Sequence, residues 1–221
     1  MKKDWREGIH KHKPATAGEA CWTWAKYDVI DWALDGAGDP GFDFGIENSA
    51  TQLVGITSGW HEWDVTNSVK EMFRNEENNG WLIKSDAEET DGYFILFKSK
   101  DNRNNKQRPR LIIYYDRSSE PIETEEVTLT FGESGNETFD NVTYDAYIDK
   151  IKCDYNMGEA RLLRVGNNGE SNYRTDRTLI SFEFIPALIY QSEISQASQI
   201  KNARLDLYVY SSEGQGEEGL F

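Results

Sequence analysis

Three aspartates with the spacing of possible metal ligands lie in a glycine-rich stretch near the N-terminus. The segment from Asp35 to Asp39 reads Asp-Gly-Ala-Gly-Asp, and Asp43 follows four residues later. Carboxylate oxygens on a flexible turn are ligands that calcium uses, although no glutamate stands at the spacing of an EF-hand loop. Calcium is therefore a candidate cofactor, with Asp35, Asp39 and Asp43 as its candidate ligands. The alternative is a solvated acidic turn without a metal.

Aromatic side chains offer a second kind of site, because their flat faces suit the apolar faces of sugars. Trp22 and Trp24 are two residues apart, a spacing that puts both rings on one face of a strand, and Tyr27 follows them. Trp60 and Trp63 are three residues apart, which splits such a pair between opposite faces. We therefore select Trp22, Trp24 and Tyr27 as candidate carbohydrate-binding residues. The alternative is that these rings are buried in the core.

Four residues are candidates for covalent chemistry. Cys21 and Cys153 are the two cysteines of the chain. They would be free thiols in a reducing compartment or one long-range disulfide outside the cell. Asn136 and Asn141 begin the glycosylation sequons Asn-Glu-Thr and Asn-Val-Thr. Such triplets also arise by chance, but two close together favour an exported protein.

No motif of a known catalytic site is present. The sequence has no GxSxG, no HExxH, no phosphate-binding loop and no zinc-like cysteine spacing. Acidic residues are numerous, but none stands out as half of a glycosidase pair. The residues themselves therefore identify no catalytic site, but they do not exclude a glycosidase pair.

Composition excludes two classes of partner. The 221 residues include 24 Lys and Arg against 39 Asp and Glu, a formal net charge of −15. Nucleic-acid binding needs a basic face, so we expect no nucleic-acid partner. No run of 18 apolar residues exists, which predicts no membrane span. The basic start is not followed by the apolar core of a signal peptide. Together with the sequons, this predicts a processed piece of an extracellular or cell-surface protein.

The elements that must position these residues are mostly short strands. Strand-like runs alternate with clusters of Gly, Asn, Asp and Ser, a pattern typical of an antiparallel β-sandwich, here of the jelly-roll kind. The clearest runs are 53–56, 80–84, 93–97, 111–115, 127–131, 161–165, 178–184 and 204–210. One amphipathic helix interrupts them over 64–74, where apolar residues recur at helical spacing. Asp64 is its expected N-cap, and the Asn-Asn-Gly at 78–80 is expected to end it.

Residues 117–126 are polar, acidic and proline-bearing, which is the composition of a linker. This linker divides the chain into two halves, 1–116 and 127–221. All seven tryptophans precede it. The halves are therefore not repeats of each other.

Both halves resemble parts of one known module. The first half carries DWREG at 4–8, ATAGEACWTW at 15–24, GWHEWDVTNSVKEMF at 59–73, NNGWLIKSD at 78–86 and RPRLIIYY at 108–115. These motifs resemble the second half of the disaggregatase-related module called DNRLRE, which is also grouped with carbohydrate-binding modules. The second half carries TYDAYID at 143–149, NMGEARLLRVG at 156–166, RTLISFEF at 177–184 and IKNARLDLYVY at 200–210. These are similar to the first half of that module, so the family's order is reversed here.

The reversed order suggests how the chain completes its fold. Gly219-Leu220-Phe221 looks like the start of a strand, and in the family's order the segment from Met1 to Trp5 would continue it. The chain could be one unit of a tandem array, a subunit completed by its neighbour, or a self-closed circular permutant. We expect head-to-tail completion between units, with Met1, Trp5, Leu220 and Phe221 at the contact, because open strand edges demand a partner.

Two functions follow from these expectations. The first is a non-catalytic extracellular structural repeat whose partners are copies of itself, in a filament, stalk or surface layer. The alternative, which the resemblance implies, is a polysaccharide-binding module attached to a carbohydrate-active enzyme. The resemblance also implies that the module itself is non-catalytic, so we expect no enzymatic activity.

Overall fold

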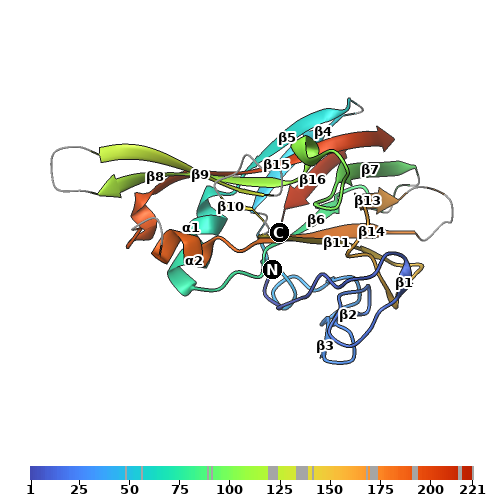
Figure 1. Ribbon diagram of the computed structural model, residues 1–221. Coiled ribbons are helices and arrows are strands. Elements are labelled where there is room, and N and C mark those ends of the chain that lie inside the picture. The colour runs from blue at the N-terminus through green and yellow to red at the C-terminus, as the bar shows by residue number, and fades with distance from the viewer. Residues whose placement is uncertain are drawn as a thin grey trace.

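The computed structural model describes most of the chain. The described residues are 1–47, 49–55, 57–88, 90, 92–118, 124–132, 139–140, 142–167, 169, 174–190, 194–213 and 216–220. Within them, twelve strands form one sheet that curls until its two arms face each other as two layers (Figure 1). All pairings in this sheet are antiparallel except that of β9 with β10. The predicted antiparallel β fold is therefore confirmed, as a curled half-barrel with one short amphipathic helix.

The strand order defines the two layers. The first layer runs through β11 (Thr143–Asp149), β14 (Asp176–Phe182), β6 (Trp81–Ser85), β16 (Gly216–Leu220) and β4 (Ala50–Val54). The second layer runs through β13 (Leu162–Asn167), β7 (Tyr93–Lys98), β15 (Ile200–Glu213) and β5 (Gly59–Asp64). The long β15 also pairs with β8 (Arg110–Ser118), followed in space by β9 (Thr124–Gly132) and β10 (Phe139–Asp140). A short contact between β13 and β14 joins the layers. Each of the eight predicted runs overlaps one of these strands.

The main core lies between the layers. Leu205, Leu207 and Val209 of β15 alternate into it and are completely buried, as their spacing predicts. Trp63 of β5 and Trp81 of β6 enter it from the two layers. Two large aromatic side chains from facing sheets supply much of the apolar area that stabilises such a sandwich.

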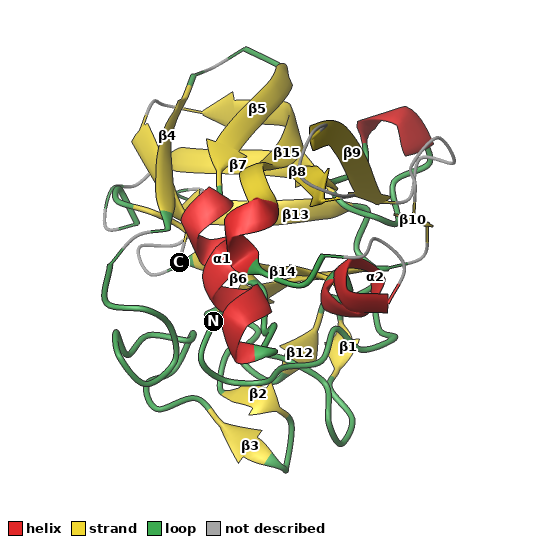
Figure 2. Cartoon of the chain, turned by 90° about the vertical axis from the view of Figure 1, so that its left-hand side faces the viewer, coloured by secondary structure: helices red, strands yellow, loops and turns green. Residues whose placement is uncertain are grey.

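The predicted helix is present as α1 (Thr66–Asn75), which lies in the foreground of Figure 2. It packs Val69 and Phe73 into the main core. Its N-cap position is Val65 rather than Asp64. The Asp64 carboxylate nevertheless accepts hydrogen bonds from the backbone N–H and the hydroxyl of Thr66, so it satisfies one first-turn donor.

The helix ends at Asn75, one residue beyond the predicted end, but a different residue terminates it. That residue is Glu76, whose φ of 53° is left-handed, and not the Asn-Asn-Gly of 78–80. Gly80 serves another purpose: a Cβ there would lie 2.1 Å from the carbonyl oxygen of Ile180. Its missing side chain therefore lets the start of β6 approach β14 closely.

Three shorter helical segments complete the architecture. They are α2 (Ile185–Tyr190) and the 3₁₀ turns η1 (Asn105–Gln107) and η2 (Ala197–Gln199). The sequence did not predict α2, because six residues are too few for a helical period to show. Leu188 and Ala197 cover the core beside α1. Among the described residues, no helix has the length and apolar content needed to cross a bilayer.

The N-terminal segment covers the outer face of the first layer. It contains β1 (Lys13–Pro14), which pairs with β12 (Tyr155–Asn156), and the small hairpin of β2 (Trp24–Lys26) and β3 (Ile30–Asp31). Trp5, Trp22 and Trp32 form a second core against Leu82 of β6 and Leu179 of β14. β6 and β14 are thus buried on both faces, because each contributes side chains to both cores. The N-terminal segment lies below them in Figure 1.

The two expected halves share this sheet within one chain. β15 and β16, from the second half, pair with β5, β7 and β8 and with β4 and β6, all from the first. Residues 117–118 extend β8 and residues 124–126 begin β9, so these parts of the expected linker are strand. Residues 1–12 form no strand, and β16, which ends at Leu220, lies between β4 and β6. Phe221 lies outside the described residues.

Head-to-tail completion between units and a self-closed chain predict different masses in solution. Because β15 and β16 find their partners in the same chain, we expect a monomer of 25.4 kDa at micromolar concentration. Size-exclusion chromatography with light scattering measures this mass. A concentration-dependent ladder of larger species would instead support head-to-tail completion.

The predicted disulfide is absent. Cys21 and Cys153 are both free; Cys153 packs against the second core, and Cys21 is fully buried. The sulfur of Cys21 is buried and lies 3.6 Å from the hydroxyl of Thr23, its hydrogen-bond partner. Burial also raises the pKa of the Cys21 thiol, which disfavours the reactive thiolate.

Candidate functional site

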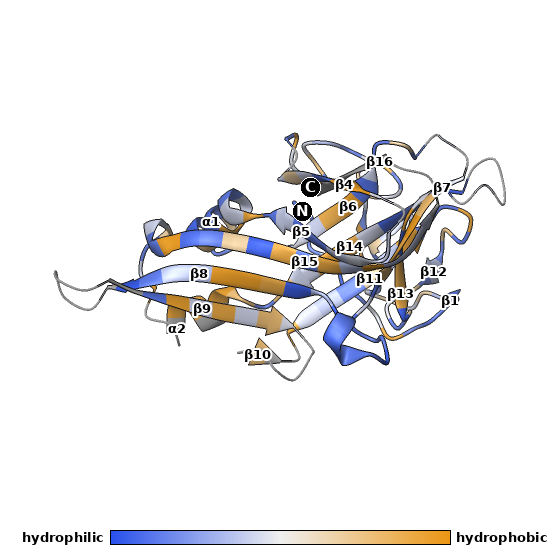
Figure 3. Ribbon diagram, turned by 90° about the horizontal axis from the view of Figure 1, so that it is seen from above, coloured by the Kyte–Doolittle hydropathy of each residue, from blue (hydrophilic) through white to orange (hydrophobic). Residues whose placement is uncertain are grey.

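The outer face of the second layer carries an exposed group of aromatic side chains. Along β15, residues between the buried apolar positions point outward, which places Tyr208 and Tyr210 on this face. Tyr210 is 51% exposed and Tyr208 is half-buried. Figure 3 views the molecule from above and shows β15 and β8 running side by side across it.

Trp60 joins this group from the neighbouring strand. β5 pairs with β15 so that Trp60 lies opposite Tyr208, and the two rings meet edge to face with centroids 5.4 Å apart. Trp63, on the same strand, is only 1% exposed and points into the core. The prediction that this tryptophan pair splits between opposite faces is confirmed. Trp60, the outward residue of the pair, is partly exposed to solvent, and it is not among the carbohydrate-binding residues predicted from the sequence.

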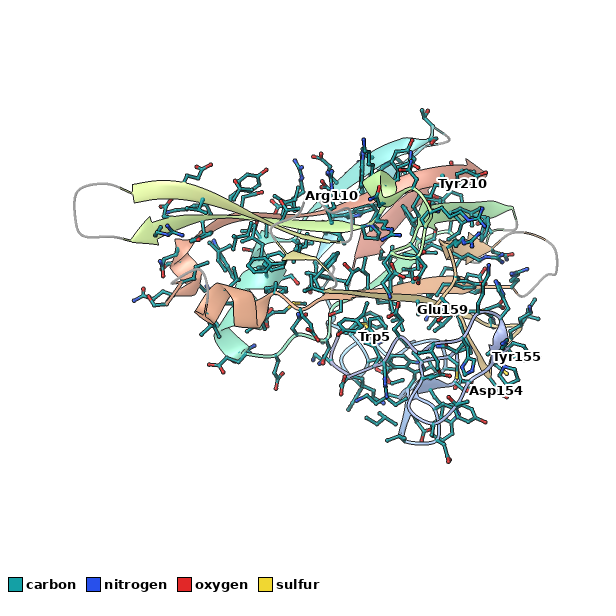
Figure 4. All side chains as sticks on the ribbon, viewed as in Figure 1. Trp5, Arg110, Asp154, Tyr155, Glu159 and Tyr210 are labelled. Carbon is teal, nitrogen blue, oxygen red and sulfur yellow. The ribbon has the colours of Figure 1, made fainter. Side chains whose placement is uncertain are left out.

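Two cations lie against these rings. The guanidinium carbon of Arg110 is 4.1 Å from the centroid of Trp60, and the ammonium of Lys98 is 3.8 Å from that of Tyr210. Both distances are within the range of favourable cation–π contacts. Burial lowers the pKa of Lys98, and the neighbouring Tyr208 opposes that shift. Figure 4 shows Arg110 and Tyr210 on the upper layer, well away from Trp5.

A charged network continues from Arg110 across the same face. Arg110 pairs with Asp206 of β15, Asp206 pairs with Arg204, and Arg204 lies 3.3 Å from Glu62 of β5. Burial raises the pKa of the Asp206 carboxyl, and the positive charges of Arg204 and Arg110 partly oppose this rise. Cations, two of them paired with carboxylates, thus lie on this face beside the partly exposed Trp60 and Tyr208 and the exposed Tyr210.

The structure brings together only part of the predicted aromatic group. Trp24 and Tyr27 are half-buried neighbours with ring centroids 5.8 Å apart. Trp22 instead packs into the second core, 7% exposed, with the guanidinium of Arg177 5.3 Å from its ring. The three rings therefore do not form one platform, because β2 begins only at Trp24 and the two-residue rule does not apply at Trp22.

The predicted calcium ligands do not converge. Asp43 is fully buried, and its carboxylate accepts hydrogen bonds from the backbone N–H groups of Ala33, Leu34 and Asp39. Its charge is balanced by Lys3, 3.4 Å away. Asp35 is exposed at the other side of the turn. Asp43 thus organises the loop by binding its amides, as a buried carboxylate must to offset its lost hydration.

A different group of carboxylates does converge within the described part of the chain. Glu7, Asp101 and Asp145 each place an oxygen within 4.8 Å of the others. Three oxygen ligands suit calcium, but the Lys100 ammonium lies 3.3 Å from Glu7 and already supplies a balancing charge. Burial, reinforced by the charge of Asp145, raises the pKa of Glu7 to about 9. The group is best described as an ionic cluster that ties the N-terminal segment to β11.

The residues predicted for assembly, Met1 and Trp5, belong neither to the aromatic face nor to the carboxylate cluster. Met1 donates its N-terminal amine to the carbonyl of Gly80, and the Trp5 indole donates to the carbonyl of Asn79. The sequon residues Asn136 and Asn141 lie outside the described residues.

One comparison with known proteins bears on the aromatic face. Residues 45–115 match the family model of carbohydrate-binding module family 96, a non-catalytic kind of domain. The matched segment covers less than half of the chain, but it includes Trp60, Lys98 and Arg110. No curated protein and no solved structure matches the chain. The match supports the carbohydrate-binding part of the resemblance, whereas the DNRLRE assignment and the reversed halves stay predictions.

Proposed function

We propose that this chain is a polysaccharide-binding module and that the outer face around Trp60, Tyr208 and Tyr210 holds the glycan. The observation that carries the proposal is the exposed aromatic and cationic group itself, part of which falls in the segment matched by a carbohydrate-binding family. This reading favours the binding alternative over the structural repeat.

The chemistry of the face suits sugars in two ways. Exposed aromatic surface can stack on the apolar faces of pyranose rings, which is the main source of affinity for such ligands. Arg110 and Lys98 bring N–H donors beside the rings, so hydroxyl or carboxylate oxygens of a glycan can be bound at the same time. An open sheet face, unlike a closed pocket, accommodates an internal segment of a long chain.

Binding assays on two variants test the proposal. We expect Trp60→Ala and Tyr210→Ala each to weaken polysaccharide binding about tenfold, because each removes a stacking surface worth ~1.4 kcal/mol. Affinity gel electrophoresis against neutral and carboxylate-bearing polysaccharides, followed by calorimetry on the best ligand, measures the change. Phe42→Ala is the control, since Phe42 is 71% exposed on the N-terminal segment.

Two outcomes would count against this face. Wild-type affinity in both variants would show that the glycan binds elsewhere. A loss confined to Trp24→Ala, measured in the same assay, would place the site at Trp24 and Tyr27, the pair that the sequence predicts and the structure keeps together.

We also propose that the module acts outside the cell or at its surface, where polysaccharides are displayed. The sequons at Asn136 and Asn141 support this location. Expression in a glycosylating host would test it: a mass increase lost in Asn136→Gln and Asn141→Gln variants is expected.

A further inference from the structure

Asp206 is a buried charge on an open face. It lies on the outward side of β15, between Arg204 and Tyr208 in the alternation, yet its side chain is only 1% exposed. The carboxylate is covered by two guanidinium groups. Arg110 donates to it at 3.0 Å, and Arg204 lies 2.7 Å and 3.1 Å from its two oxygens.

The pairing register explains how Asp206 reaches Arg110. Asp206 lies directly opposite Arg110 of β8 on one side and opposite Glu62 of β5 on the other. Arg110 therefore extends across β15, over Asp206, to the ring of Trp60 on the next strand. Its guanidinium is held between a carboxylate and an indole, which restricts both its position and its tilt.

We propose that Asp206 is a positioning residue of the glycan site: it fixes Arg110 against Trp60 and so sets the orientation of the ring that the ligand meets. This inference rests on the proposed function. Arg204 already pairs with the carboxylate, through a hydrogen bond from Nη2 and an ion-pair distance of 2.7 Å from Nε, so balancing the buried charge does not by itself require Arg110 or its contact with Trp60. Arg110, the second cation, contacts both the buried Asp206 carboxylate and the ring of Trp60.

Preorganisation gives this arrangement its value for binding. A free arginine and a free indole would each lose rotamer freedom when a ligand orders them. Here the ion pair has already ordered Arg110, and Arg110 covers part of the Trp60 ring before any glycan arrives. Arg110 Nε is buried, so the donors that remain for a ligand beside the ring are the terminal N–H groups that Asp206 does not engage.

The test combines a ligand-free readout with affinity. In ¹H–¹⁵N NMR spectra, the Trp60 indole signal, assigned with Trp60→Phe, is expected to shift in Asp206→Asn and in Arg110→Gln. It should stay in place in Glu62→Gln, which removes a carboxylate from the exposed end of the same network. Trp81, whose indole donates to Ser68 in the core, gives an internal reference signal.

Affinity should follow the same pattern. Asp206→Asn and Arg110→Gln are each expected to weaken polysaccharide binding roughly three- to tenfold. The double variant should lose no more affinity than the single variant with the larger loss, because the two residues act as a unit. Additive losses, or an unmoved Trp60 signal, would overturn the proposal. If Asp206→Asn fails to fold, Arg110→Gln and Arg110→Lys carry the test, with both expected to move the signal. If the wild type binds no polysaccharide, the proposed function fails, while the indole signal still reports whether Asp206 positions Arg110 and Trp60.

Discussion

Replacing Trp63 by alanine is expected to lower the free energy of unfolding by about 3–5 kcal/mol, the usual cost of removing a large buried aromatic side chain. Trp63 is 1% exposed and meets Phe97 edge to face, with ring centroids 6.0 Å apart. It stands between the two layers, so the cavity would open in the centre of the main core. Neighbouring β15 and β7 are each hydrogen-bonded to strands on both sides, so they cannot easily collapse into the cavity.

The matched control lies three residues earlier on the same strand. Trp60→Ala is expected to cost less than about 1 kcal/mol of stability, because Trp60 packs on the surface against Tyr208 and Arg110. Urea unfolding followed by circular dichroism measures both variants, and the binding assay is run on each. We expect a crossed result, in which Trp63→Ala loses stability and Trp60→Ala loses affinity. Equal losses of stability would contradict the assignment of the two faces of β5.

Much of the fold can be predicted from the sequence because its signals are local. The alternation of Leu205, Leu207 and Val209 identifies β15 and its buried face. The helical spacing over 65–73 identifies α1 to within two residues. Strand pairing is not local: that β16 would insert between β4 and β6, or that β15 would contact three strands of the first half, depends on partners far away in the chain.

The candidate site was missed for the same reason. The spacing rule correctly separates Trp60 from Trp63, and the same rule identifies Trp60 as the outward ring of the pair. Tyr208 and Tyr210 lie at outward positions of a strand that the sequence did predict. What the sequence cannot show is the register that places Tyr208 opposite Trp60. Aromatic residues at outward positions of two strands suggest a binding site. Only the pairing of those strands shows that the residues lie side by side.

The aspartate loop shows the opposite error. Three carboxylates in a glycine-rich turn look like ligands, and the local sequence does not reveal that Asp43 turns inward to bind three backbone amides. The carboxylates that do converge, Glu7, Asp101 and Asp145, come from segments that are far apart in the sequence. Their proximity is a product of the fold.

That ionic cluster gives the second large expected effect. Glu7 and the buried Asp145 face one ammonium, Lys100, and both carboxylates are held away from solvent. Burial and the charge of Asp145 raise the pKa of Glu7 from its ordinary 4.5 to about 9. The folded chain therefore holds a proton on Glu7 that the unfolded chain releases above its ordinary pKa. The stability that this proton provides is fully present below pH 4.5 and is lost progressively as the pH rises through about 9.

Glu7→Gln should remove this pH dependence, because an amide resembles the protonated carboxyl but does not titrate. Its carbonyl oxygen can still accept the hydrogen bond that the backbone N–H of Asp145 donates to Glu7. We expect the variant to match the wild type near pH 5 and to exceed its free energy of unfolding at pH 8 by on the order of 1–2 kcal/mol. Urea unfolding at several pH values between 5 and 9 measures the difference.

Asp176, whose pKa burial raises to about 7, titrates in both proteins, so only their difference reports on Glu7. Glu47→Gln, at an exposed position, should run parallel to the wild type. A parallel course for Glu7→Gln as well would show that Glu7 is ionised in the fold and that Lys100 neutralises it fully.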